Sequence, residues 1–205
     1  MVRTVDYKKI KDYASEILWH FLLIFRRKSF GPKVFCIGYN KTGTTSVGKA
    51  IESLGFFHSS FNKKVWRNWY KRDKIDKVLK YTSKFDSFDD LPWLKEEMIP
   101  ILDRTFKNSK WIYLVREEKS WKTSFRNWSY KKLGEYPNVD EKYQNYLKHQ
   151  SFVLDYFKDR DCLLVVNVQE VGAYSKIAKF LNKKAPFPDL PVYNRTVDWK
   201  GRVSN

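Results

Sequence analysis

The hydrophobic residues of this chain follow two patterns that alternate along the sequence. Short segments rich in apolar side chains predict strands at residues 34–37, 56–58, 84–88, 111–115 and 163–168. Between them, apolar residues recur at spacings of three and four, which predicts helices through Val47 to Leu54 and at about 119–132, 140–158 and 170–182. Strands that alternate with helices favour an α/β fold with a mainly parallel sheet.

Two of these strands should lie in the middle of the sheet. Val34–Ile37 and Trp111–Val115 are apolar at every position, and a continuous apolar run is typical of a parallel strand that is covered on both faces. We therefore expect a three-layer domain in which helices flank a central sheet.

The first 32 residues are predicted to form a separate element in front of a domain at residues 33–205. Residues 7–28 carry apolar side chains at helical spacing and end in Arg26-Arg27-Lys28. Such a helix could pack on the domain or lie on an anionic membrane surface. It should not span a bilayer, because the apolar run Ile17–Phe25 has nine residues and a span needs ~20.

Length and charge narrow the class of protein. A chain of 205 residues with 42% hydrophobic residues is long enough for one domain with a substantial core and too apolar to be disordered. The net charge of +17 indicates an anionic partner, which could be a nucleotide, a glycan, a membrane surface or nucleic acid. Charge alone does not choose among them.

The cysteines and the glycosylation pattern favour the cytoplasm. Cys36 and Cys162 form neither a metal-binding spacing nor a disulfide framework. The Asn-x-Thr site at Asn40 lies inside the phosphate-binding loop described next, where a glycan would block the site. We expect a cytoplasmic protein, with peripheral membrane attachment if residues 7–28 bind lipid.

The strongest chemical signal is the loop Gly38-Tyr-Asn-Lys-Thr-Gly43-Thr-Thr45, which stands between a predicted strand and a predicted helix. Backbone N–H groups at such a turn and at the helix N-terminus can hold phosphate or sulfate oxygens. The spacing of Gly38 and Gly43 matches the first part of a Walker A loop, but Thr44 stands where that motif has its lysine. The lysine lies inside the loop, as Lys41.

The sequence Lys41-Thr-Gly-Thr-Thr45 after a buried strand resembles the 5′-phosphosulfate loop of sulfotransferases that use 3′-phosphoadenosine-5′-phosphosulfate (PAPS). The resemblance implies a P-loop-type fold, PAPS as cosubstrate, 3′,5′-adenosine bisphosphate (PAP) as product, and no metal. It assigns the 5′-phosphate and the sulfate to Lys41, Thr42, Gly43, Thr44, Thr45 and Ser46. Many cytosolic members follow the threonines with a tryptophan that stacks on adenine, whereas this chain has Ser46-Val47.

A second element is Arg116 at the end of a strand, with Ser124 eight residues further on. An arginine fork and a hydroxyl suit a terminal phosphate. In the family that the loop resembles, an arginine and a serine at this spacing hold the 3′-phosphate of PAPS. Trp121 between them is interpreted as a packing residue.

The candidate general bases lie in or just after the second and third predicted strands. Asp90 precedes Leu91-Pro92, where the resemblance places a catalytic histidine, and a carboxylate with a tuned pKa can remove a hydroxyl proton. Asp89 and Asp86 are reserve candidates, and His58 is the alternative base. The alternative to a role as general base is that Asp90 only caps a helix.

These signals predict metal-independent, in-line transfer of a sulfuryl group from PAPS to a hydroxyl or amine. The acceptor class stays open among small molecules, glycans, lipid headgroups and peptide tyrosines. One alternative is a P-loop nucleotide kinase, which the missing Walker lysine disfavours. Another is a noncatalytic domain that binds polyanions or nucleic acid through residues 63–84, which have a net charge of +7 interleaved with the aromatics Trp66, Trp69 and Tyr70. Nucleic acid is the less favoured partner.

Overall fold

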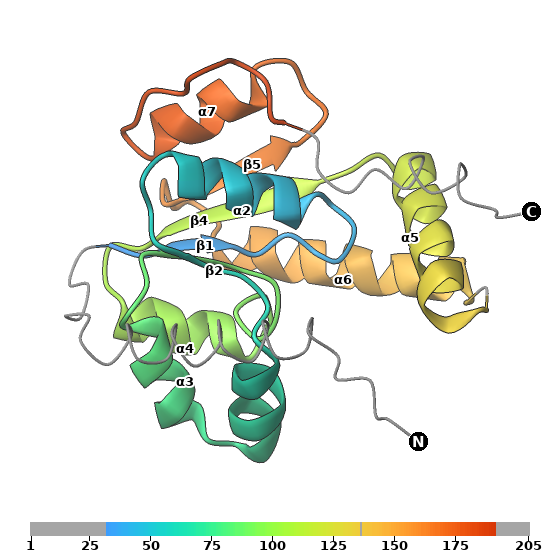
Figure 1. The fold of residues 1–205 in the computed structure, drawn as a ribbon, viewed down its shortest axis with the longest axis horizontal. Coiled ribbons are helices and arrows are strands. Elements are labelled where there is room, and N and C mark those ends of the chain that lie inside the picture. The colour runs from blue at the N-terminus through green and yellow to red at the C-terminus, as the bar shows by residue number, and fades with distance from the viewer. Residues whose placement is uncertain (1–31, 136, 192–205) are drawn as a thin grey trace, which may run out of the picture.

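The computed structural model describes residues 32–135 and 137–191 and shows an α/β domain built on one parallel sheet (Figure 1). The strands are β1 (Val34–Cys36), β2 (His58–Ser59), β3 (Ser87–Asp89), β4 (Lys110–Val115) and β5 (Leu163–Asn167). They lie in the order β2-β3-β1-β4-β5, and every pair is parallel. The fold class predicted from the sequence is confirmed. The helix predicted at residues 7–28, and with it the boundary at residue 32, lies outside the described residues.

The two strands that were expected to be central are central. β1 pairs with β3 on one side and with β4 on the other, and β4 pairs in turn with β5. Both are buried along nearly their whole length, which is the reason for their continuous apolar sequences.

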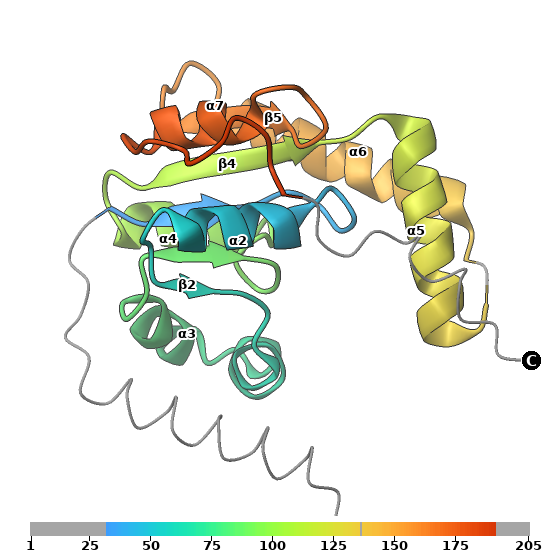
Figure 2. The same cartoon turned by 45° about the horizontal axis from the view of Figure 1, so that its top comes forward.

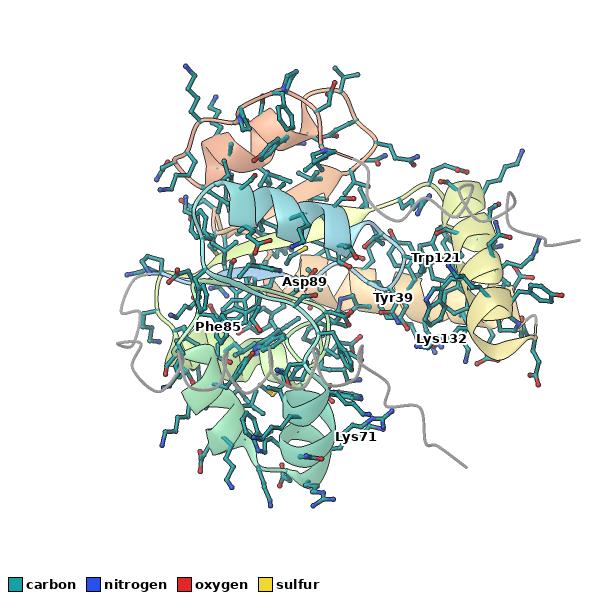
Figure 3. All side chains as sticks on the ribbon, viewed as in Figure 1. Tyr39, Lys71, Phe85, Asp89, Trp121 and Lys132 are labelled. Atoms are coloured by element: carbon teal, nitrogen blue, oxygen red, sulfur yellow. The ribbon has the colours of Figure 1, made fainter. Side chains whose placement is uncertain are left out.

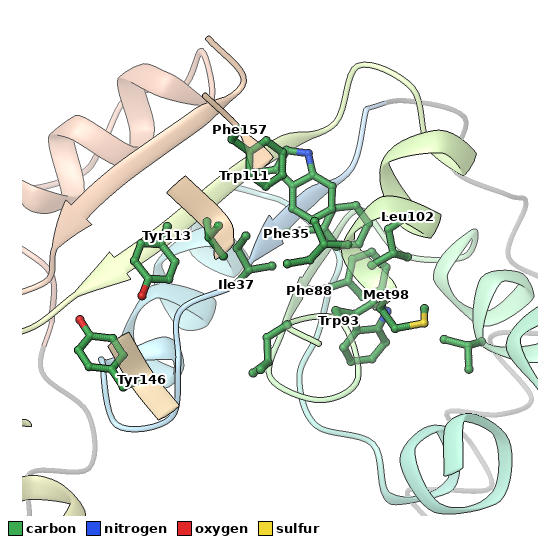
Figure 4. Close-up of a cluster of buried hydrophobic side chains, with 14 of the residues drawn as sticks. Phe35, Ile37, Phe88, Trp93, Met98, Leu102, Trp111, Tyr113, Tyr146 and Phe157 are labelled. Atoms are coloured by element: carbon green, nitrogen blue, oxygen red, sulfur yellow. The ribbon is translucent and has the colours of Figure 1, made fainter. Parts of the chain in front are cut away.

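Helices cover both faces of the sheet, and the alternation of side chains along each strand divides the core in two (Figures 1 and 2). On one face α2 (Thr44–Ser53) and α7 (Ala173–Phe180) pack on Val34, Cys36, Ile112 and Leu114. On the other face α3 (Ile75–Thr82), α4 (Met98–Thr105) and α6 (Val139–Tyr156) pack on Phe35, Trp111 and Tyr113. Figure 4 shows the aromatic side chains of this second, larger cluster.

One helix, α5 (Glu118–Leu133), extends from the carboxyl end of β4 and stands at that end of the sheet (Figure 1). Its bounds agree closely with those of the helix predicted at 119–132. None of the helices among the described residues combines the length and the hydropathy needed to cross a bilayer.

The sequence patterns did not predict the helices between β2 and β4. Residues 60–84, here called the cap, contain a π-helical turn at Val65–Trp69, a 3₁₀ turn at Tyr70–Arg72 and α3. Only three residues of this segment, Val65, Val78 and Thr82, are buried, which leaves too few apolar positions to define a helical pattern in the sequence. In α4, Pro100 lies in the first turn. A proline is tolerated there because a backbone N–H at that position would have no acceptor within the helix.

Two strands begin later than expected. The strands predicted at 56–58 and 84–88 are observed at His58–Ser59 and Ser87–Asp89. The rings of Phe57 and Phe85 stack on each other at 4.6 Å, so their apolar character reflects a core contact outside the sheet.

Candidate functional site

The glycine loop follows β1 and leads directly into α2, as the sequence predicted. Neither of its two glycines could carry a side chain without a clash, and one of them also has a backbone conformation that favours glycine. A Cβ at Gly38 would lie 2.7 Å from Leu114 Cβ, and one at Gly43 would lie 2.8 Å from a methyl group of Val168. Gly43 also has φ +104°, in the region that favours glycine. The loop is therefore seated tightly over the carboxyl ends of β4 and β5.

The loop leaves N–H groups free at the start of α2, where an anion could bind. The first N–H groups of a helix lack intrahelical acceptors, and those of Thr44 and Thr45 are the first here. Thr42 holds the loop together, because its buried hydroxyl and its amide both donate to the carbonyl of Tyr39, at 2.6 and 3.2 Å. The amide of Ser46 donates to the carbonyl of Gly43 at 3.0 Å.

Lys41 projects from the loop in the left-handed conformation, with φ +69°. Its side chain is half-buried, and its ammonium lies 5.8 Å from the ring centre of Trp128 on α5. Burial lowers the pKa of Lys41, and the positive charges of Arg116 and Lys131 lower it further. A cation that is partly desolvated and surrounded by like charge favours an anionic ligand.

Arg116 follows β4 and contacts the loop directly. Its Nη1 donates to the carbonyl of Lys41 at 2.8 Å, and its Nε donates to the hydroxyl of Ser120 at 2.9 Å. Burial lowers the pKa of the guanidinium. The structure thus brings Arg116 and Lys41 together, but the hydroxyl bonded to Arg116 is that of Ser120. Ser124 lies one turn further along α5 and is buried.

Two buried side chains hold the loop backbone in place. Trp121 Nε1 donates to the carbonyl of Asn40 at 2.7 Å, and His149 Nε2 lies 3.0 Å from the carbonyl oxygen of Ile37. Tyr146 stacks on Trp121 and lies 5.9 Å from the ring of Tyr39. Figure 3 shows Trp121 and Tyr39 close together beside α5.

Sequence reasoning had assigned Trp121 to packing and had given Tyr146 and His149 no role. A spacing of three between two polar aromatics, on the same side of α6 as the apolar Val139 and Val153, was the signal that could have identified them.

Asp90 lies beside the loop because β3 and β1 are neighbours in the sheet. It has φ +65°, and its Oδ1 accepts a hydrogen bond from the amide of Leu91 at 2.6 Å. Burial raises the pKa of Asp90, the Leu91 N–H opposes this effect, and the charge of Asp89 adds to it. The same two carboxylates contribute to the raised pKa of Cys36, whose main cause is burial.

His58 and Asp89 form a buried pair under α2. His58 Nε2 lies 3.4 Å from Asp89 Oδ1, and His58 Nδ1 lies 2.9 Å from the hydroxyl of Ser87. A Cβ at Gly48 would lie 2.7 Å from His58 Nε2. The backbone of α2 therefore passes directly over the pair and separates it from solvent.

Asp86, a reserve candidate base, lies away from this site. It precedes β3, and its Oδ2 accepts from the amide of Phe57 at 3.0 Å, so it stands at the amino edge of the sheet. In the described ranges no three His, Cys, Asp or Glu side chains are grouped closely enough to hold a metal ion.

Comparison with known proteins gave one family. The family model described as "Sulfotransferase domain" matches residues 33–139, which is just over half of the chain. No curated protein matches the chain significantly. Among the solved structures that match is a gluconokinase from Sinorhizobium meliloti 1021, with 16% identity, a TM-score of 0.48, and coverage of 76% of this chain and 94% of that one.

Proposed function

Because the chain belongs to the sulfotransferase domain family, we propose that it transfers a sulfuryl group from PAPS to a hydroxyl or amine acceptor. The observation that supports this most is the convergence of two cations on one glycine loop at a helix N-terminus. Arg116 bonds to the carbonyl of Lys41 at 2.8 Å although 75 positions separate the two residues. Each cation then has its own anionic group of the nucleotide to bind.

The loop and Arg116 would bind different groups of the nucleotide. The N–H groups of Gly43, Thr44 and Thr45 and the ammonium of Lys41 would hold the 5′-phosphosulfate, by the same physics that places phosphates at helix N-termini. Arg116 would hold the 3′-phosphate, together with Ser120 or the predicted Ser124. A guanidinium and a hydroxyl form charge-assisted hydrogen bonds with a phosphate dianion.

The chemistry would rely on position and charge. In the transfer, the acceptor oxygen forms a bond to sulfur as the bond from sulfur to the bridging phosphate oxygen breaks, and the acceptor proton passes to Asp90. Lys41 would stabilise the negative charge that develops on the bridging oxygen. Asp90 fits the role of base because burial raises its pKa and because it lies beside the loop at the end of β3. His58 and Asp89 are buried more deeply, so we assign them to the support of α2.

We expect PAP to bind without Mg²⁺ and clearly more tightly than AMP or ATP. Arg116→Ala should abolish the preference over AMP and weaken PAP binding by about 10- to 150-fold, because a charge-assisted bond contributes about 1.5–3 kcal/mol. Isothermal titration calorimetry measures both effects.

The matched control for that experiment is Arg104→Ala. Arg104 is an exposed arginine in the last turn of α4, before β4 begins, and its removal should leave PAP affinity unchanged. Magnesium-dependent binding of ATP, with no preference for PAP, would support the kinase alternative.

The rate of transfer should rise with pH through the raised pKa of Asp90, because only the carboxylate form can accept the acceptor's proton. Asp90→Asn should remove this rise and lower kcat by about 10²- to 10⁴-fold, with little change in PAP affinity. The measurement is kcat against pH for both proteins. If His58→Gln removes the pH dependence and Asp90→Asn does not, the base is His58.

A further inference from the structure

The cap carries exposed positive charge that is not neutralised by an ion pair within the described part of the chain. Seven of its basic side chains are exposed and form no ion pair with any described residue: Lys63, Arg67, Lys71, Arg72, Lys74, Lys77 and Lys80. Three of them, at Lys74, Lys77 and Lys80, follow one another at a spacing of three along α3, and residues at that spacing are neighbours on a helix surface.

Part of the positive charge elsewhere on the domain is paired. Lys122 pairs with Glu118 and Asp140, Arg160 pairs with Asp103, and Lys176 pairs with Glu170. In the cap the only exposed acids are Asp73 and Asp76, and neither lies in an ion pair with a described residue. The positive field of the cap is therefore available to a partner.

The aromatic side chains of the cap are used inside it. Trp66 stacks on Tyr70 at 4.9 Å, and the edge of Trp69 meets Tyr81 at 6.0 Å. Lys71 lies 5.3 Å from the ring centre of Trp66. Among the large hydrophobic side chains of the cap only Phe61 is exposed.

This arrangement discriminates between polyanions. Binding of single-stranded nucleic acid relies on aromatic rings that are free to stack with bases, and a helix that lies in a lipid surface buries an apolar face in addition to its contacts with charged headgroups. The cap offers little of either, since Phe61 is its one exposed large hydrophobic side chain and the rest of its exposed surface is mainly charged.

The first part of the cap lies toward the same edge of the sheet as the proposed reaction site, and α3 then leads the chain back toward the start of β3. β2 carries the chain to the carboxyl edge of the sheet, where the glycine loop also lies, and the π-helical turn begins six residues after Ser59. In Figure 3, Lys71 lies toward the same end of the strands as Asp89 and Tyr39, whereas Phe85 precedes β3 at the other end.

From these observations we infer that the acceptor is an acidic polysaccharide, held along the cap by its carboxylates while one of its hydroxyls reaches Asp90. A polysaccharide supplies repeated negative charge, acceptor hydroxyls and no need for stacking. This inference rests on the proposed function, because it identifies the acceptor of that transfer.

The test compares two variants that each lose four positive charges. The cap variant is Lys71→Gln, Lys74→Gln, Lys77→Gln and Lys80→Gln. The control variant removes exposed lysines outside the cap, as Lys107→Gln, Lys158→Gln, Lys179→Gln and Lys184→Gln. The probe is an unsulfated chondroitin chain of defined length, with neutral dextran and a single-stranded oligo-dT as comparison ligands.

The cap variant should bind chondroitin at least about tenfold more weakly, because several surface ion pairs are lost together, while the control variant changes by less than about twofold. The affinity of the cap variant for chondroitin should also depend less on salt concentration. With labelled PAPS, the cap variant should raise KM for the glycan and leave kcat nearly unchanged.

Equal weakening in the two variants would overturn the inference, since net charge alone would then explain binding. So would tighter binding of oligo-dT than of chondroitin through the cap. PAP affinity is measured in parallel to separate the two proposals. If the unmodified protein does not bind PAP, the proposed function is contradicted. If it binds PAP but no glycan, only the inference about the acceptor is contradicted.

Discussion

Lys41→Ala should lower kcat by about a hundredfold or more and weaken PAP binding by much less. The negative charge on the bridging oxygen grows as its bond to sulfur breaks, so a cation aimed at that oxygen stabilises the transition state more than the bound ground state. The expected loss corresponds to removal of one preorganised oxyanion donor. Steady-state kinetics with labelled PAPS, together with PAP titration, measures the two effects separately.

The control for this prediction is a lysine of the neighbouring helix. Lys49 lies on α2, is exposed and pairs with Glu52 at 2.7 Å, so Lys49→Ala should leave both constants unchanged. Lys41→Arg keeps the charge and should recover part of the rate. An unchanged kcat with a large loss of PAP affinity would show that Lys41 only binds the nucleotide.

The second large effect is expected at Trp121, which supports the loop from α5. Its side chain is fully buried and stacks on Phe125 and Tyr146 at 4.9 and 5.5 Å. Trp121→Ala should lower the free energy of unfolding by about 3–5 kcal/mol, a large part of the ~5–15 kcal/mol typical of a domain. Denaturant titration measures this loss.

Trp121→Phe separates packing from the hydrogen bond. It keeps most of the ring contact but leaves the carbonyl of Asn40 without its donor, so we expect a loss of about 1–3 kcal/mol in stability and weaker PAP binding. The matched control is Trp111→Phe. Trp111 is equally buried, and its Nε1 has no hydrogen-bond partner among the described residues. The Trp111→Phe variant should therefore lose stability only through the loss of packing contacts and should keep its affinity for PAP. Equal PAP affinities in the two variants would contradict a role of Trp121 in shaping the loop.

The sheet and the loop could be predicted because each depends on local sequence. A parallel strand covered on both faces must be apolar throughout, and β1 and β4 are. The conformation of the loop requires glycine at positions 38 and 43, and the sequence shows both. The same local logic placed α5 and α6 to within one or two residues.

The parts that escaped prediction depend on contacts between distant segments. Tyr146 and His149 reach the loop only because α6 packs under β1 and β4. The choice of Ser120 over Ser124 as the partner of Arg116 depends on where α5 begins relative to β4. The depth of the His58–Asp89 pair follows from the close passage of Gly48. The spacing of Tyr146 and His149 shows that the two side chains share a helix face, but spacing along the chain does not give the distance from that face to the loop.

The cations that surround the loop also affect the stability of the fold itself. Lys41 is partly buried beside the charges of Arg116 and Lys131, and its pKa is lowered in the folded protein. The unfolded chain therefore binds this proton more firmly, and the ligand-free fold gains stability as pH rises through the lowered pKa toward the ordinary value for lysine. Selection for thermal stability alone would remove such a residue. An anion in the loop offsets the repulsion, so the nucleotide should act as a stabiliser of the whole domain as well as a reactant.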